Sequence, residues 1–224
     1  MLKKFGKLFR RKQAVRKCDL RANSIKNIAI FGYANTTENE PLFQEVFHVS
    51  KRLAEAGYTI VDGGGPGVML AASLGAKEAG GKVIGVTLYP KDMKNFEGKD
   101  PKNLLDVEIK TDTYVERTLT LMKQGQIYVI FQGGTGTISE FGMAWGLARL
   151  YFGHHKPLIL YGKFWKKIID AFRENMLLRP EEAKVFKIVE NPEEVLQAIY
   201  DFECEIASGQ HDGHLKASTQ GFSI

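Results

Sequence analysis

Short apolar runs alternate with longer amphipathic stretches along most of this chain. The runs have the length and composition of buried strands, whereas the stretches repeat apolar residues at intervals of three and four, as helices do. The predicted strands are 28–31, 58–61, 82–88, 104–109, 127–131, 157–161 and 185–189. The predicted helices are 41–56, 68–79, 138–151, 164–177, 191–206 and one that is capped by Asp112 or Thr113 and ends at Lys123. This alternation predicts a single α/β domain in which helices cover both faces of a parallel sheet.

Length and composition agree with this fold class. The chain has 224 residues, of which 44% are hydrophobic and 25% charged, as in soluble globular domains. No apolar run approaches the ~18 residues that a membrane-spanning helix needs. The two cysteines, Cys18 and Cys204, form neither a metal motif nor a disulfide framework, so we expect a cytoplasmic protein. We divide the chain into a basic N-terminal arm at 1–24, a domain at 25–207 and a disordered tail at 208–224.

The positive charge is concentrated at the beginning of the chain. The net charge is +5 overall, but residues 1–21 hold nine Lys or Arg and one acid. The remainder has 22 basic and 25 acidic residues, a net charge of −3, which argues against a nucleic-acid-binding fold. Apolar residues also recur at helical spacing in the arm: Leu2, Phe5, Leu8 and Phe9. Such an arm suits contact with an anionic membrane or a partner; a solvated, frayed end and, in a eukaryote, a mitochondrial targeting segment are the alternatives.

Two glycine-rich turns are the strongest functional signal. Gly63–Gly67 and Gly133–Thr137 each follow a predicted strand and lead into a predicted helix. A glycine turn at this place lets the backbone approach a ligand and directs free N–H groups and the positive end of a helix at an anion. Ligands bind beyond the carboxyl ends of parallel strands, so both turns are expected to border one crevice. The pattern predicts a site for a phosphorylated small molecule.

Other catalytic motifs are missing from the sequence. Neither glycine turn completes the dinucleotide fingerprint or the phosphate-binding loop with its lysine, and there is no serine-hydrolase elbow or zinc-protease motif. We interpret His154-His155 as a solvated loop rather than a metal site.

The chemistry then rests on two charged residues. Glu140 is expected in the first turn of the helix after the second glycine turn, and Arg117 at the start of the preceding helix, at the same edge of the sheet. The alternative is structural: Arg117 pairs on the surface with Glu116 or Asp112, and Glu140 complements the helix dipole.

Three motifs together resemble the Lonely Guy (LOG) family of cytokinin-nucleotide phosphoribohydrolases. They are Gly63–Met69, Tyr114–Arg117 and Gly133–Glu140, and the similarity extends from about residue 26 to residue 206. The resemblance implies a Rossmann-like, doubly wound parallel sheet in three layers. The chain differs from the family at Gln132, where members have proline, and at Thr118, where many have lysine. It also has Asp62 before the first glycines, where members often have threonine or tyrosine, and Tyr33 in place of a serine.

The resemblance also implies roles for individual residues. Glu140 matches the family's catalytic glutamate and Arg117 its arginine. The 5′-phosphate would be held by Gly133, Gly134, Thr135, Gly136 and Thr137, and the other side of the site would be lined by Gly64, Gly65 and Met69. The implied reaction cleaves the N-glycosidic bond of a nucleotide of the adenosine monophosphate (AMP) type, without metal or redox cofactor, in a homodimer or larger assembly. Two alternatives remain: a non-catalytic protein that carries molybdenum cofactor or senses nucleotides, and a regulator docked through the basic arm.

Overall fold

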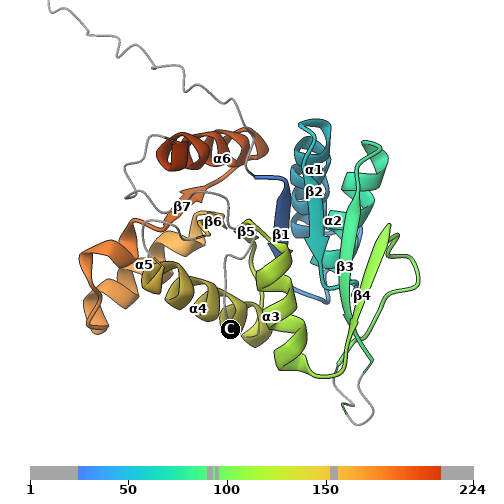
Figure 1. Cartoon of the computed structure of the whole chain (residues 1–224), viewed down its shortest axis with the longest axis horizontal. Helices are drawn as coiled ribbons and strands as arrows, with labels where there is room; N and C mark the ends of the chain where they lie inside the picture. Colours follow the sequence, from blue (N-terminus) through green and yellow to red (C-terminus); the bar gives the residue numbers. More distant parts are fainter. Residues whose placement is uncertain (1–24, 90–92, 94–95, 152–155, 208–224) are drawn as a thin grey trace, which may run out of the picture.

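The structure is a computed structural model that describes residues 25–89, 93, 96–151 and 156–207. The predicted arm and tail, and the histidine pair, lie outside these residues. Within them strands and helices alternate from end to end (Figure 1). The strands are β1 Asn27–Phe31, β2 Thr59–Asp62, β3 Val83–Leu88, β4 Val107–Thr111, β5 Ile127–Ile130, β6 Leu158–Tyr161 and β7 Phe186–Val189. The helices are α1 Pro41–Glu55, α2 Val68–Glu78, α3 Tyr114–Gln124, α4 Thr135–Leu150, α5 Phe164–Asn175, the 3-10 helix η1 Pro180–Ala183 and α6 Pro192–Ala207.

All neighbouring strands of the sheet are parallel, in the order β4-β3-β2-β1-β5-β6-β7. Strands β1 to β4 follow one another toward one edge of the sheet, and the chain then crosses back to add β5 on the other side of β1. In a doubly wound sheet the connections leave in opposite directions at such a switch point, which opens a crevice at the carboxyl ends of the two central strands. The predicted Rossmann-like fold is confirmed, and the crevice lies between β1 and β5.

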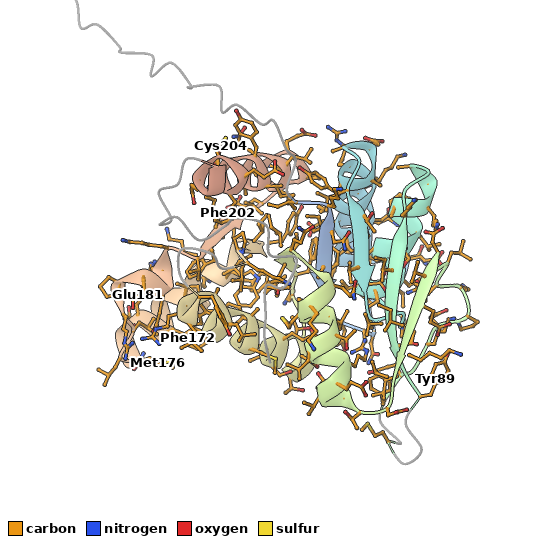
Figure 2. The ribbon with its side chains drawn as sticks, in the orientation of Figure 1. Tyr89, Phe172, Met176, Glu181, Phe202 and Cys204 are labelled. Atoms are coloured by element: carbon orange, nitrogen blue, oxygen red, sulfur yellow. The ribbon has the colours of Figure 1, made fainter. Side chains whose placement is uncertain are left out.

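Helices cover both faces of the sheet. One face carries α1, α2 and α6, and the other carries α3, α4 and α5 (Figure 1). The inner strands β1, β2, β3, β5 and β6 are buried between two layers, which explains why they are largely apolar rather than alternating, whereas the edge strand β4 is mostly exposed or half-buried and carries charged residues. The outer helices are one-sided instead: Figure 2 shows Phe202 on the sheet-facing side of α6 and Cys204 on the other, and Phe202 is buried.

Two elements begin three residues away from the predicted position. Strand β4 begins at Val107, not at residue 104, because Leu105 packs over Gly85 of β3 from a loop; a Cβ on Gly85 would lie 2.3 Å from its Cδ1. Helix α4 begins at Thr135, earlier than the predicted residue 138, because Gly134 already takes the N-cap position and its carbonyl accepts from Ile138 N. The short helix η1 had no sequence signal that we recognised.

The loop after β1 is joined to the start of α2. The N–H of Val68 donates to the carbonyl of Tyr33 at 2.9 Å. Gly67, just before it, has a φ of 65°, and a Cβ there would lie 2.3 Å from the carbonyl oxygen of Ala34. Only glycine fits this junction, which fixes the first wall of the crevice.

Candidate functional site

A cavity of about 520 Å³ opens at the switch point of the sheet. Its walls are the loop after β1, the first glycine turn, the segment 96–98, α3 and the start of α4. The lining residues are Ile30, Phe31, Gly32, Tyr33, Ala34, Gly63, Met69, Phe96, Glu97, Gly98, Tyr114, Arg117, Leu121, Gly134, Thr135, Gly136, Thr137, Ser139 and Glu140. The cavity therefore contains Arg117, Glu140 and most of the second glycine turn, as the sequence predicted.

The second glycine turn presents the start of α4 to this cavity. Gly134 caps the helix without a side-chain hydrogen bond, and the next three residues have no preceding turn to accept from their N–H groups. Free N–H groups and the helix dipole together favour an anion there. Gly133 lies behind the lining, where a Cβ would be 2.1 Å from Oγ1 of Thr137. Glycine at 133 thus makes room for the Thr137 side chain.

Glu140 lies in the second turn of α4, one turn later than expected because the helix starts early. It is buried, with 8% of its surface exposed, and it lines the cavity. Within the part of the chain that the structure describes, its carboxylate makes no hydrogen bond and no ion pair; its electrostatic partner is Arg117. Burial raises the pKa of Glu140 to about 7, against the lowering effect of Arg117. A first-turn acid that only complements the helix dipole would be solvated, so the structural alternative is wrong for this residue.

Arg117 is also buried, at 5% exposed. Its Nε donates to the carbonyl of Val86 at 3.0 Å and its Nη2 to the carbonyl of Gly63 at 3.1 Å. Nη2 also lies 3.4 Å from the sulfur of Met69, and the ring of Phe96 lies 5.6 Å from the guanidinium carbon. These contacts leave both N–H groups of Nη1 without a hydrogen-bond acceptor among the described residues. Arg117 is therefore fixed by backbone carbonyls and keeps donors for a ligand.

The alternative in which Arg117 pairs on the surface with Glu116 or Asp112 does not hold. Glu116 instead accepts from the N–H of Asp112 at 3.0 Å, while Thr113 caps α3 by accepting from Glu116 N. Thr113 thus satisfies a free N–H group in the first turn, and Glu116 reaches back to the residue before the N-cap, a variant of the capping box. Arg117 points the other way, into the protein.

The first glycine turn has a different role from the second. Gly64 and Gly65 are buried and do not line the cavity, whereas Gly63 and Met69 do. The N–H of Gly64 donates to Asp62 at 2.6 Å, and its carbonyl accepts from Asp100 N at 2.9 Å. Because its polar groups bind the protein, this turn supports Arg117 and the segment 98–103 rather than offering N–H groups to an anion.

Sequence reasoning missed the aromatic part of the lining. Tyr33, Phe96 and Tyr114 border the cavity, and the Tyr114 hydroxyl lies 3.4 Å from Oγ of Ser139. Tyr114 opens the same helix as Arg117, so its position at that edge of the sheet was a usable signal. Thr118, by contrast, is buried and donates to the carbonyl of Tyr114 at 3.0 Å, away from the lining residues.

No described helix has the length and apolar character to cross a bilayer. No three His, Cys, Asp or Glu side chains in the described ranges are grouped as a metal site requires.

Comparisons with known proteins agree with the motifs. The model of the SLOG cluster4 family matches residues 25–196. A cytokinin riboside 5′-monophosphate phosphoribohydrolase from Mycobacterium tuberculosis is 28% identical over 178 residues, covering 76% of this chain and 91% of that protein. An enzyme of the same name from Arabidopsis thaliana is 24% identical over 189 residues, covering 78% and 77%.

Solved structures show the same fold. The molybdenum cofactor binding protein of Rippkaea orientalis has a TM-score of 0.59 at 22% identity, covering 81% of this chain and 99% of that one. The molybdenum cofactor carrier protein of Chlamydomonas reinhardtii has a TM-score of 0.58 at 22% identity, covering 79% and 97%. The resemblance to LOG proteins is confirmed by the family match and the named relatives, and the chain belongs to the SLOG cluster4 family.

Proposed function

We propose that this protein hydrolyses the N-glycosidic bond of AMP-type nucleoside 5′-monophosphates, releasing a free base and ribose 5-phosphate. The observation that carries the proposal is the Glu140 carboxyl, which is buried, lines the cavity and has no hydrogen-bond partner in the described chain. Burying such a group without a partner costs stability, and proteins keep this cost mainly at functional sites. The relatives named phosphoribohydrolase support the same reaction.

The start of α4 would anchor the 5′-phosphate. The free N–H groups of Thr135, Gly136 and Thr137 are the donors, and the buried Thr137 side chain lines the same wall. Glu140 follows Thr137 by three residues, so both lie on one face of the helix. A phosphate at the helix end would therefore place the sugar of the same molecule on the face that carries the carboxylate.

Cleavage of such a bond passes through an oxocarbenium-like transition state. Ionised Glu140 would stabilise the positive charge on the sugar and accept a proton from the attacking water. The water supplies a hydroxyl to the sugar carbon, the leaving base takes up one proton from solvent, and Glu140 returns the proton that it gained to solvent. A carboxyl whose pKa is about 7 is well matched to this task near neutral pH. Arg117, held by Val86 and Gly63, would direct its free Nη1 donors at the ligand.

A carrier of a phosphate-bearing cargo, such as molybdenum cofactor, is the second candidate. The fold similarity to carrier proteins favours it, and so does Thr118, which stands where many LOG members have lysine and is turned toward the Tyr114 carbonyl. A carrier needs the phosphate anchor and the cavity but no turnover. The two candidates therefore differ in product release and not in binding.

We further propose a cytoplasmic homodimer that binds no nucleic acid. Helix α4 leaves apolar surface exposed: Ile138 is 43% and Leu150 67% exposed, and a Cβ at Gly142 or Gly146 between them would meet nothing within 4 Å. Exposed apolar surface of this kind often packs against a second copy. Light scattering at micromolar concentration should give a dimer or larger mass, and a monomer would contradict the assembly.

The function is tested with a panel of nucleoside 5′-monophosphates and the matching nucleosides, measured by release of free base. We expect release from AMP or an N6-substituted analogue and none from nucleosides. Glu140→Gln should lower turnover ~10²–10⁴-fold while binding survives, whereas Glu174→Gln, an exposed carboxyl on α5, should leave it unchanged. Binding of nucleotides without release of base in the wild type would favour the carrier.

A further inference from the structure

A buried polar network lies directly behind the first glycine turn. Its centre is Asp62, the last residue of β2, which is completely buried. One carboxyl oxygen, Oδ1, accepts from the N–H of Gly64 at 2.6 Å. The other, Oδ2, lies 2.7 Å from the hydroxyl of Ser73 on α2. Asn103, in the loop before β4, completes the network and links it to the segment that borders the cavity.

The orientation of the Asn103 amide is determined by its neighbours. Its nitrogen lies 3.0 Å from the carbonyl oxygen of Gly65 and 3.5 Å from Oδ1 of Asp62. Both of these atoms are acceptors, so the nitrogen must face them, and a flipped amide would place two oxygens together. The amide oxygen of Asn103 consequently faces the Ser73 hydroxyl, 2.5 Å away.

The Ser73 hydroxyl now lies between two oxygens but has one proton. An amide oxygen carries no proton, so the short contact with Asn103 requires Ser73 to donate there. The 2.7 Å contact with Asp62 then needs a proton from the other side. If Ser73 donated to an ionised Asp62 instead, its oxygen would face the Asn103 oxygen at 2.5 Å with no proton between them.

We propose that Asp62 is a neutral carboxylic acid in the folded protein at mildly acidic pH and a positioning residue for the cavity. The carboxyl O–H of Asp62 donates a hydrogen bond to the Ser73 hydroxyl oxygen, Ser73 donates to the amide oxygen of Asn103, and the Asn103 amide nitrogen donates to the carbonyl of Gly65. The chain of hydrogen bonds ties α2 and the loop before β4 to the turn whose Gly63 carbonyl holds Arg117. The part that concerns the ligand rests on the proposed function, whereas the protonation does not.

The charges around Asp62 agree with a neutral acid. Among the described residues it forms no ion pair, and Arg117 on α3 is the charged side chain whose field reaches it. Nearby cations are engaged elsewhere: Lys77 of α2 with Asp106, and Lys99 with Glu108. The positive charge of Arg117 also acts on Glu140 of α4, whose pKa it lowers as it lowers that of Asp62. Burial outweighs Arg117 and the hydrogen bonds, and it raises the pKa of Asp62 to about 6.

The sign of the pH effect follows from that raised pKa. The folded chain holds the proton more tightly than the unfolded chain, whose Asp has a pKa of 3.8. The stability from this proton is complete below pH 3.8 and is lost as the pH rises through about 6. Glu140 has the same sign, so the test is made in a Glu140→Gln background, in which that carboxyl no longer titrates.

The test compares Asp62→Asn with Asp62→Ala by urea denaturation at pH 5 and pH 8. The Asn amide can donate to Ser73 and accept from Gly64, as the neutral acid does. The parent loses stability between pH 5 and pH 8 as the folded Asp62 ionises, so we expect the advantage of Asp62→Asn over its parent to be larger at pH 8 than at pH 5. Asp62→Ala should be less stable than Asp62→Asn at both pH values. An infrared difference spectrum at pH 5 should show a protonated carboxyl that Asp62→Asn removes.

Two results would overturn the proposal. One is Asp62→Asn unfolding at lower urea than its parent at pH 8, as expected if an ionised Asp62 held Arg117. The other is the absence of the protonated carboxyl band at pH 5. For the positioning role, AMP should bind Asp62→Asn as it binds the wild type and Asn103→Ala ~10-fold or more weakly. Equal binding by Asn103→Ala would remove that role and leave the hydrolysis question open.

Discussion

Replacing Glu140 by glutamine should make the protein more stable at high pH while it destroys activity. The buried carboxyl has a pKa of about 7 in the folded chain, against 4.5 in the unfolded one. Each pKa unit corresponds to about 1.4 kcal/mol, so keeping this carboxyl ionised costs the folded state about 3 kcal/mol. Because the pKa is raised on folding, the contribution of protonated Glu140 to the free energy of unfolding is fully present below pH 4.5. It is lost as the pH rises through about 7.

Glutamine has nearly the same shape as glutamate, but its amide does not ionise. At pH 8 we expect Glu140→Gln to exceed the wild type by about 1–3 kcal/mol, the lower values allowing for the burial of its own amide. Near pH 4.5 the two should be equal, because Glu140 is protonated in the folded wild type. Urea denaturation at several pH values, with the linear extrapolation, measures both free energies. The exposed Glu174→Gln variant serves as the control and should show no such pH-dependent gain.

A gain of stability together with a loss of turnover is typical of a residue retained for function. If Glu140→Gln were no more stable than the wild type at pH 8, the carboxylate would be compensated in the folded protein. The cavity would then lack the poised acid that the proposed hydrolysis requires.

Three further results are expected. Gly67→Ala should lower the free energy of unfolding by more than ~2 kcal/mol, since φ is 65° and the Cβ would lie 2.3 Å from the Ala34 carbonyl oxygen; denaturation at neutral pH measures it, and a neutral effect would contradict the packing. Calorimetry should show AMP binding at least ~100-fold more tightly than adenosine, since charge-assisted hydrogen bonds contribute about 1.5–3 kcal/mol each; equal affinities would refute the phosphate anchor. Deleting residues 1–24 should leave the domain folded and abolish any salt-sensitive binding to anionic vesicles, and unfolding on deletion would place the arm in the core.

Much of the fold was predictable because it depends on local patterns. Buried parallel strands give continuous apolar runs, and Gly57 and Gly80, both with positive φ, end helices where the pattern stops. The switch point follows from the order of strands and helices once the sheet is known to be parallel. Strand β4 was misplaced because Leu105 is apolar for a tertiary reason, its contact with Gly85 of the neighbouring strand.

The residues that line the cavity were largely predictable, but the different roles of the two glycine turns were not. Spacing made Glu140, Arg117 and the second glycine turn candidates and the family resemblance supported them; both side chains and most of that turn line one cavity. The first turn looked equivalent to the second in sequence. Its polar groups are used by Asp62, Asp100 and Asn103, two of which lie in a loop far along the chain. Contacts of that kind have no local signature.

The proposed function is tested most directly by a single-turnover experiment, with the protein in excess over AMP or an N6-substituted analogue. We predict free base and ribose 5-phosphate in equal amounts, at a rate that rises with pH through about 7 as Glu140 ionises. Glu140→Gln should bind the nucleotide and release base at least ~100-fold more slowly. Saturable binding by the wild type with no base above the uncatalysed level would contradict hydrolysis and leave a nucleotide-binding or carrier protein.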